Sequence, residues 1–337
     1  KLDTGYNIGF SKKEVQEIKL IEKAPEKEEK FEIKKDAEKP NIAMIITGGT
    51  IAARLNPRKG GVDWLDTPES LFKFYPGIFN RVNVIKLEVP FMKSSEDMDF
   101  KDWQKIARVA EKFLNDGNIK GIIITHGTDF LHYTSAALSF FLRNLNKPVV
   151  LTYSQRSIDR ASSDANLNLQ CAALAAISDI AEVMLVGHAS TNDDFCYAMP
   201  GTKVRKLHSS RRDAFKVVNT KPFAKVYSAP LGVPKNAELG GNKIIKISDY
   251  RVRNKNKAKL DLKFEEGVAL VKVYPGQCPS ILDFYVKEKY KGIVLEMSGL
   301  GHAPTKRSRN NWTKKLKEVQ KKGLIVCGVS QCIYGRV

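Results

Sequence analysis

The chain has 337 residues, of which 42% are hydrophobic and 28% are charged, and its 56 Lys and Arg outnumber its 37 Asp and Glu to give a net charge of +19. This balance is typical of a soluble globular protein and excludes collagen-like, low-complexity and largely disordered chains. The length suits about two domains. No apolar run approaches the roughly 20 residues that a membrane-spanning helix needs.

Two further features of composition bear on the compartment. The start of the chain carries no apolar leader segment, and five cysteines are too few for a disulfide scaffold. We therefore expect a reduced, cytoplasmic protein whose cysteines are small buried side chains. The positive charge favours encounters with polyanions, but it leaves open a choice between nucleic acid and simple solvation.

Two short segments precede the first clear domain. Residues 1–21 have short-strand and turn character and are interpreted as the end of a preceding segment. Residues 22–40 hold 13 charged residues out of 19 and two prolines, which predicts a charged linker with too little apolar surface to fold. Because the chain starts without Met, we expect a fragment or a processed chain.

A first α/β domain is predicted over residues 41–225. Helical apolar spacing at 99–115, 130–144 and 164–180 alternates with apolar runs of strand length, which lie at 41–46, 82–89, 121–125, 148–152 and 182–187. Strands that are apolar throughout and alternate with helices indicate a parallel sheet covered on both faces. In such sheets ligands bind beyond the carboxyl ends of the strands.

A second, smaller α/β domain is predicted over residues 264–337. Residues 226–263, rich in Pro, Gly and basic residues, are interpreted as the linker that leads to it. Its expected helices lie near 279–289 and 310–321, and its expected strands lie at 268–274, 292–297 and 324–329. Because the chain stops directly after strand-like residues, we expect this domain to be cut short.

Two motifs follow strands of the first domain. The turn Thr47-Gly48-Gly49-Thr50 lacks both common phosphate-binding glycine patterns, so it favours close approach of backbone and hydroxyl to a small substrate. The pair Thr128-Asp129 fits a catalytic site and a helix N-cap about equally. Since both motifs follow parallel strands, Thr50 and Thr128 should share one rim although 78 positions separate them.

A basic cluster at residues 203–215 is the third candidate. Its ordinary interpretation is a solvated charged loop, which charge patterning favours by about two to one. The functional alternatives are contact with an anion or RNA, or a single buried Lys that belongs to a site.

Together these segments resemble the L-asparaginase-type amidohydrolases. Residues 47–52 and 126–129 match their two signature motifs, Ser95-Glu96-Asp97-Met98 falls at their substrate loop, and Lys206 falls at their catalytic lysine. Within that family, further segments resemble the GatD branch, which comprises the amidohydrolase components of archaeal glutamyl-tRNA(Gln) amidotransferases. These segments are residues 1–9, 155–164, 204–215 and 330–337.

The resemblance implies an asparaginase-like two-domain α/β fold, preceded by the end of a small β domain. It makes Thr50 the nucleophile on a side-chain amide and assigns proton transfer to Thr128, Asp129 and Lys206. It implies that Asp129 and four further residues bind the substrate: Gly49, Ser95, Glu96 and Gly127. Backbone N–H groups near Gly49 or Thr128 are candidates for an oxyanion hole, and no metal is expected.

The same resemblance implies partners. A second component of the amidotransferase, GatE, would bind tRNA(Gln) carrying glutamate and would hold ATP and Mg²⁺, so this chain needs no cofactor of its own. The expected assembly is a homodimer of this chain within a heterotetramer, with glutamine or asparagine as ammonia donor.

A free-standing L-asparaginase and an inactive RNA-binding scaffold are the alternatives. The tyrosine that asparaginases place after the first motif is missing from residues 54–61.

Overall fold

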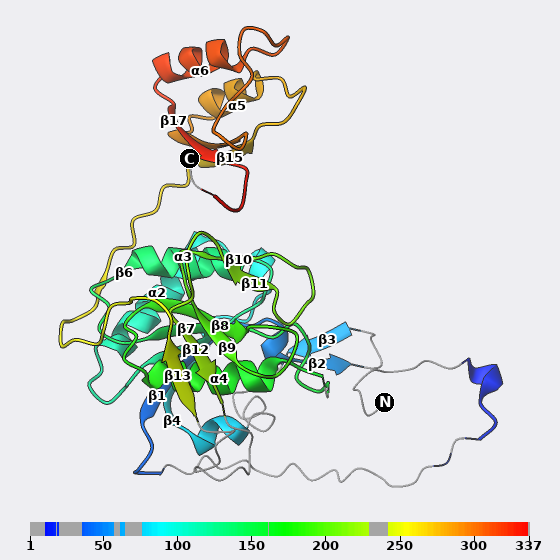
Figure 1. Ribbon diagram of the computed structural model, residues 1–337, viewed down its shortest axis with the longest axis vertical. Coiled ribbons are helices and arrows are strands. Elements are labelled where there is room, and N and C mark those ends of the chain that lie inside the picture. Colours follow the sequence, from blue (N-terminus) through cyan, green and yellow to red (C-terminus); the bar gives the residue numbers. More distant parts are fainter. Residues whose placement is uncertain are drawn as a thin grey trace. The chain divides into compact units, whose positions relative to one another are not determined.

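The structure is a computed structural model that describes residues 11–17, 19, 36–56, 61–64, 76–160, 162–228 and 242–335 (Figure 1). The chain divides into two compact units, Lys1–Leu262 and Lys263–Val337. The small β domain expected at 1–21 and the linker expected at 22–40 lie largely outside the described residues. Within them the structure places the 3₁₀ turn η1 (Lys12–Glu14).

The first unit is built on a mixed sheet, for which the described residues provide eight strands in the order β13 (Lys243–Lys246), β12 (Ala224–Tyr227), β9 (Cys196–Pro200), β8 (Val183–His188), β7 (Val149–Thr152), β5 (Ile122–Thr125), β1 (Asn41–Ile46) and β4 (Asn83–Glu88). The five strands from β8 to β4 are parallel, as expected from their apolar sequences. The remaining three strands continue the sheet antiparallel. The predicted α/β class with a helix-covered sheet is confirmed.

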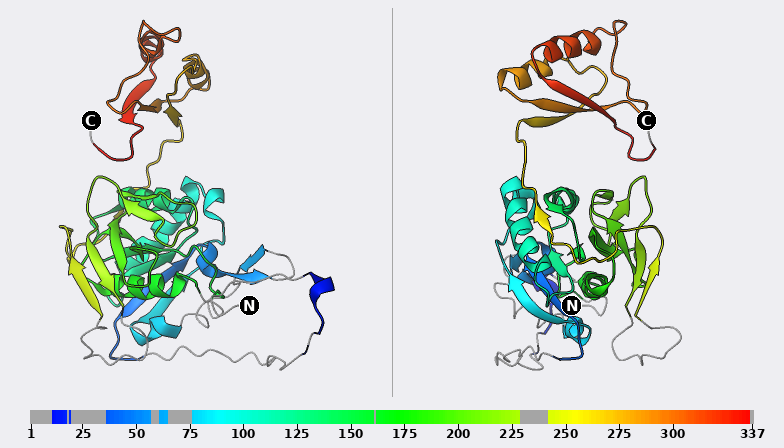
Figure 2. Two further views of the ribbon diagram at one scale, coloured as in Figure 1. Left: turned by 45° about the vertical axis from the view of Figure 1, so that its right-hand side comes forward. Right: turned by 90° about the vertical axis from the view of Figure 1, so that its left-hand side faces the viewer.

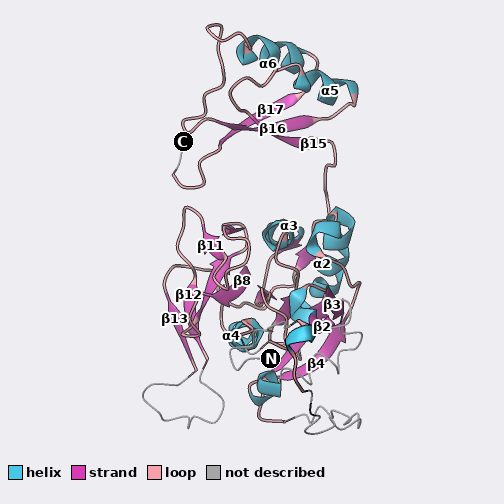
Figure 3. Cartoon of the chain, turned by 90° about the vertical axis from the view of Figure 1, so that its right-hand side faces the viewer, coloured by secondary structure: helices cyan, strands magenta, loops and turns pink. Residues whose placement is uncertain are grey.

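Helices cover both faces of this sheet. Helices α2 (Phe100–Leu114) and α3 (Leu131–Phe141) lie on one face and α4 (Ala165–Ile177) lies on the other (Figures 2 and 3). Side chains alternate between the two cores, so that Ile124 joins α2 and α3 while its neighbour Ile123 joins α4. Each such fully buried side chain contributes about 1.5–3 kcal/mol.

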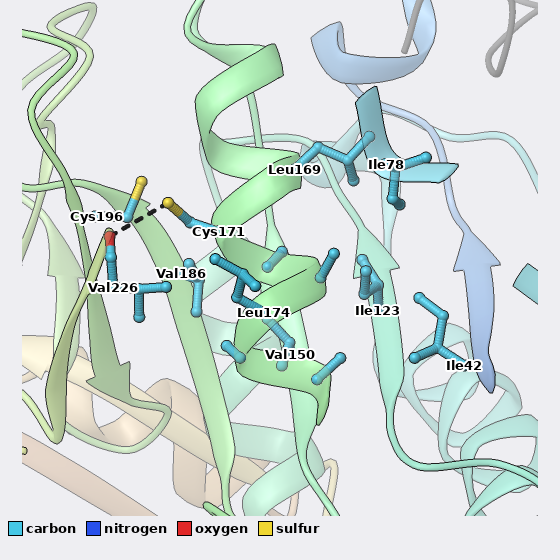
Figure 4. Packing of buried hydrophobic residues seen from close by; sticks show 14 of the residues in the cluster. Ile42, Ile78, Ile123, Val150, Leu169, Cys171, Leu174, Val186, Cys196 and Val226 are labelled. Atoms are coloured by element: carbon cyan, nitrogen blue, oxygen red, sulfur yellow. Dashed lines mark hydrogen bonds between the residues drawn. The ribbon is translucent and has the colours of Figure 1, made fainter. Parts of the chain in front are cut away.

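Figure 4 shows the core on the α4 side. Leu169 and Leu174 of α4 lie there among apolar residues of the sheet, including Ile123, Val150 and Val186. The Cys171 thiol donates a hydrogen bond to the carbonyl of Val226 at 3.3 Å. Cys171 and Cys196 are buried as expected. The expectation is wrong for Cys278, Cys327 and Cys332, which are exposed in the second unit.

The interpretation of residues 226–263 as a linker is wrong for the part that the structure describes. Strand β13 pairs with β12 at the edge of the main sheet. Strand β14 (Lys259–Leu260) pairs with β6 (Leu142–Arg143), so the predicted helix 130–144 ends early, at Phe141. The predicted helix 164–180 ends at Ile177, and the Arg253 guanidinium donates to nearby carbonyls of Ala176 and Ser178.

The first unit also contains short strands and 3₁₀ turns outside the main sheet. A hairpin follows the first motif, with β2 (Ala53–Asn56) antiparallel to β3 (Gly61–Trp64), and the tip at 57–60 lies outside the described residues. A second ribbon pairs β10 (Val204–Lys206) with β11 (Phe215–Val217). The first unit also has the 3₁₀ turns η2 (Thr50–Ala52), η3 (Pro76–Asn80), which contacts α4, and η4 (Ser95–Asp97).

The second unit has a parallel sheet of β15 (Val268–Lys272), β16 (Gly292–Met297) and β17 (Ile325–Ser330), each within a residue or two of its predicted range. Helices α5 (Ile281–Lys287) and α6 (Trp312–Lys321) pack on it, and their core includes Leu282, Leu295 and Trp312. Among the described residues of either unit, no helix is long and apolar enough to cross a membrane.

Candidate functional site

The turns that follow β1 and β5 are joined through their backbones. The Thr47 hydroxyl and the Thr47 amide both donate to the carbonyl of Thr125, at 2.8 and 3.3 Å. Gly49 has φ 85°, and a Cβ added there would lie 2.3 Å from the Gly127 nitrogen. Only glycine permits this approach, so the two motifs meet at one sheet edge, as their strand-end positions predict.

The predicted substrate loop, Ser95 to Met98, lies at the same edge of the sheet. A Cβ added at Gly127 would lie 3.1 Å from the Ser95 backbone nitrogen. The buried Ser95 hydroxyl accepts a hydrogen bond from the Phe130 amide at 3.2 Å and donates one to Glu96 Oε2 at 3.3 Å. Two residues predicted to bind substrate, Gly49 and Ser95, therefore both adjoin a third, Gly127, and a fourth, Glu96, is hydrogen-bonded to Ser95.

Lys206 comes to this edge from β10, which packs against α3. Its Nζ donates to Thr128 Oγ1 at 2.8 Å and to Asp129 Oδ1 at 2.7 Å, and its side chain is only 10% exposed. Of the three interpretations of the basic cluster, the single Lys at a site fits this residue.

The helix-capping interpretation of Thr128 and Asp129 is wrong. Helix α3 has Phe130 as its N-cap residue, and no side chain caps it. The Thr128 hydroxyl and one Asp129 oxygen instead accept hydrogen bonds from Lys206. Both side chains are thus directed to the amine rather than to the helix end.

Thr50 lies at the start of η2, directly after Gly49. It is half-buried, and the two residues that follow it, Ile51 and Ala52, are fully buried in the core on the α4 side. This anchoring fixes the backbone of Thr50 beside the Gly49–Gly127 contact. Its role as nucleophile remains a prediction.

The buried His126 supports the second motif, to which it belongs, through two hydrogen bonds. Its Nδ1 lies 2.7 Å from the Gly127 carbonyl and its Nε2 lies 2.9 Å from the Thr134 hydroxyl. A carbonyl can only accept, so Nδ1 carries the proton and Thr134 donates to Nε2. Burial lowers the pKa of His126 to about 4, against a smaller opposing effect of the Gly127 carbonyl. The imidazole is therefore a neutral structural support.

We expect His126 to make the fold sensitive to acid. Its folded pKa lies below the ordinary 6.5, so the unfolded chain takes up the proton first. The contribution of neutral His126 to the free energy of unfolding is fully present above pH 6.5. It is lost as the pH falls toward 4, by about 1 kcal/mol for each pH unit. Urea unfolding of the wild type and of His126→Asn between pH 7 and 4.5 measures this. A variant with the same pH slope as the wild type would exclude His126 as the cause.

His132 is a neighbour of the site that sequence reasoning missed. Burial, followed by the charges of Arg205 and Lys206, lowers its pKa to about 4. Its buried Nδ1 has no hydrogen-bond partner among the described residues. No local pattern marks His132, because its place beside Arg205 and Lys206 depends on the packing of β10 against α3.

A second missed residue, Lys93, ties the substrate loop to the rest of the site. The Lys93 amide donates to the Thr47 carbonyl at 3.0 Å, and its backbone packs against Gly48. Its ammonium contacts Asp102 at 2.7 Å, and this carboxylate is only 2% exposed. The hydrogen bond from Lys93 to Asp102 raises the pKa of Lys93. Lys93 thus joins the first motif and the Ser95 loop to the start of α2.

Replacing Lys93 with Met should raise the KM for the amide substrate roughly tenfold and change kcat less, because the loop that carries Ser95 loses its anchor. Lys105→Met is the matched control, since Lys105 contacts the other oxygen of Asp102 at 3.1 Å but lies on α2. In each variant the other lysine remains as a partner for the buried carboxylate. Equal KM values in the two variants would contradict the anchoring role.

Most other basic side chains of the 203–216 region are neutralised within the chain. Arg211 pairs with Asp213 at 2.9 Å, and Arg212 pairs with Asp193 at 3.0 Å. Lys216 contacts the second oxygen of Asp213 at 2.7 Å. These pairs brace the ribbon that carries Lys206, so the structure does not favour this cluster as the RNA-binding surface.

Comparison with known proteins shows two family matches. Residues 41–238 match the family "Asparaginase, N-terminal", and residues 267–337 match the "Glutaminase/Asparaginase C-terminal domain". Among solved structures, the thermostable L-asparaginase from Thermococcus kodakarensis is similar with a TM-score of 0.73 at 28% identity, over 88% of this chain and 81% of its own. L-asparaginase I from Vibrio cholerae gives 0.72 at 27% identity, over 89% and 83%.

Relatives found by sequence have higher identity to this chain than the solved structures do, and they are not named as asparaginases. The D subunit of the glutamyl-tRNA(Gln) amidotransferase, GatD, from Pyrococcus furiosus is 48% identical over all of this chain and 74% of its own length. The proteins of that name from Thermococcus kodakarensis and Methanopyrus kandleri are 45% and 40% identical, over 73% and 72% of their lengths.

Proposed function

The chain belongs to the asparaginase/glutaminase family and, within it, to the GatD proteins of glutamyl-tRNA(Gln) amidotransferases, and from this membership we propose the reaction that it carries out. It hydrolyses the side-chain amide of glutamine, or of asparagine, and supplies the ammonia that converts glutamate on tRNA(Gln) to glutamine. The observation that carries the proposal is the contact of Lys206 with both Thr128 and Asp129.

The chemistry begins at Thr50. Its hydroxyl oxygen attacks the amide carbon while its proton passes to the Thr128–Lys206 pair, since a free hydroxyl is a poor nucleophile. The C–N bond then breaks, and the nitrogen takes up that proton and leaves as ammonia. Water attacks the resulting ester, the same pair accepts its proton, and glutamate leaves as Thr50 regains its hydrogen.

The remaining residues position the substrate. Asp129, 62% exposed at the mouth of the site, retains an oxygen for the substrate ammonium. The Ser95–Glu96 pair supplies a hydroxyl and a second carboxylate beside Gly127. A glutamine or asparagine bound through its charged main-chain groups places its side-chain amide toward the turn that carries Thr50.

The name of the relatives implies a complex of several subunits. We propose that GatE is the partner, that it holds ATP, Mg²⁺ and tRNA(Gln) carrying glutamate, and that two copies of this chain form a homodimer in a heterotetramer. Among the described residues no group of three His, Cys, Asp or Glu could hold a metal ion. The amide chemistry proposed for Thr50 and Lys206 needs none.

Glutaminase activity measured with and without GatE and glutamyl-tRNA tests this function. We expect strong stimulation by the two together, because ammonia is useful only when its acceptor is activated. Unaided turnover of asparagine at full rate would instead favour a free-standing asparaginase. No turnover under any condition would favour an inactive RNA-binding scaffold.

A further inference from the structure

A strongly basic surface lies in the second unit, far along the sequence from the candidate site. Residues 305–322 contain eight Lys and Arg and a single acid, Glu318. Six of the basic residues define what we call the basic face: Lys306, Arg307, Arg309, Lys314, Lys317 and Lys321. All six are exposed.

Helix α6 presents three members of the basic face on its outer side. Trp312 and Val319 are completely buried and fix the helix against the sheet, and the Trp312 indole donates to the Gln277 carbonyl at 3.2 Å. At 100° per residue, Lys314, Lys317 and Lys321 fall within about 60° of one another on the opposite side. They form a row about 10 Å long.

The charges of the basic face are not neutralised by neighbours. Glu318 and Asp283 both pair with Lys315, which lies between the two sides of the helix. No acidic side chain in the described part of the second unit pairs with any of the six. In the first unit, by contrast, Arg211, Arg212 and Lys216 all have acidic partners.

Helix stability does not explain this arrangement. Cations stabilise the carboxyl end of a helix by about 0.3–1 kcal/mol and destabilise the amino end by a similar amount. Lys321 is at the favourable end, but the three residues of the 306–309 loop and Lys314 flank the amino end. The first turn of α6 contains no acid to offset them.

We propose that the basic face binds the phosphate backbone of tRNA, and this inference rests on the proposed function, which places tRNA at the complex. Phosphate contacts are made by exposed Lys and Arg without an apolar centre. Protein interfaces, in contrast, are depleted in Lys and enriched in aromatic residues at their core. The positive helix end beside three further cations attracts a phosphate for the same electrostatic reason.

The test uses the complex of the full chain with GatE. Lys314→Gln, Lys317→Gln and Lys321→Gln are combined, and the Kd for tRNA(Gln) is measured from 50 to 300 mM KCl. Each lost phosphate contact reduces the slope of log Kd against log salt by about 0.7–0.9. We expect the slope to fall by about 2 and the Kd at 50 mM to rise at least tenfold.

The control removes three exposed charges from a helix of the first unit, through Lys101→Gln, Arg108→Gln and Lys112→Gln in α2. A loss of slope equal to that of the basic-face variant would show a general charge effect and overturn the proposal. Loss of GatE from the basic-face variant, with no change in tRNA binding by this chain alone, would assign the face to a protein and overturn it as well.

Glutaminase activity of the same variants separates this inference from the proposed function. Since the proposed amide chemistry uses Thr50, Thr128 and Lys206 and no residue of the basic face, basal glutamine hydrolysis should not change in the basic-face variant. A wild-type complex that hydrolyses no amide would refute the proposed function, whereas the salt slopes alone decide the role of the basic face.

Discussion

Thr50→Val should abolish glutamine-dependent amidation of glutamyl-tRNA while leaving amidation with free ammonia intact. Valine keeps the shape of threonine but removes the attacking oxygen, so we expect a loss of at least about 10³-fold in kcat with glutamine as donor. The ammonia-dependent reaction bypasses the amidohydrolase step. Amidation rates of the complex with each nitrogen donor measure the two activities side by side.

The control for this experiment is Thr50→Ser, which keeps a hydroxyl in the same place. It should retain measurable glutamine-dependent activity, because the 3₁₀ turn after Gly49 is anchored by Ile51 and Ala52 rather than by the threonine methyl group. Equal loss of amidation with both nitrogen donors in Thr50→Val would contradict the division of labour between the subunits.

Lys206→Met should lower kcat by about 10²- to 10⁴-fold and change the KM for glutamine much less. The amine contacts Thr128 and Asp129, so its loss removes the proton acceptor while the groups that hold the substrate remain. Steady-state kinetics over a range of glutamine concentrations separate the two parameters. A rise in KM with unchanged kcat would make Lys206 a substrate-binding residue.

Two companion variants sharpen that result. Lys203→Met removes an exposed charge just before β10 and should leave kcat unchanged. Thr128→Val in the Lys206→Met background should cost little more than either change alone, because residues that act as one unit lose their function together. Multiplied losses in the double variant would show that the two side chains act independently.

The first unit was predictable from the sequence because its strands are buried on both faces. The runs at 41–46 and 121–125 have no polar interruption and end in turn motifs, so both their position and their shared edge follow from the pattern. The edge strand β13 and its neighbour β12 are different. Their residues are partly exposed, and β13 is rich in Lys, so the sequence of 226–263 is indistinguishable from a solvated linker.

The site was predictable to the extent that its residues follow strands. Thr128 and Asp129 come from one motif, and resemblance to the asparaginases, which the family matches confirm, supplied Lys206. Lys93 and His132 were missed because their importance depends on tertiary contacts, with Asp102 and Lys206, that no local spacing encodes. The basic cluster at 203–215 left several interpretations open because one of its acidic partners, Asp193, is distant in sequence.

Covalent labelling tests the central claim most directly. A glutamine analogue that carries a diazoketone in place of the amide alkylates the nucleophile that attacks the side-chain carbon, and peptide mass spectrometry then locates the adduct. We expect a single adduct on Thr50, its loss in Thr50→Val, and slower labelling in Lys206→Met. An adduct on Thr128 or Ser95, or labelling that persists in Thr50→Val, would contradict the assignment of Thr50 as the nucleophile activated by Thr128 and Lys206.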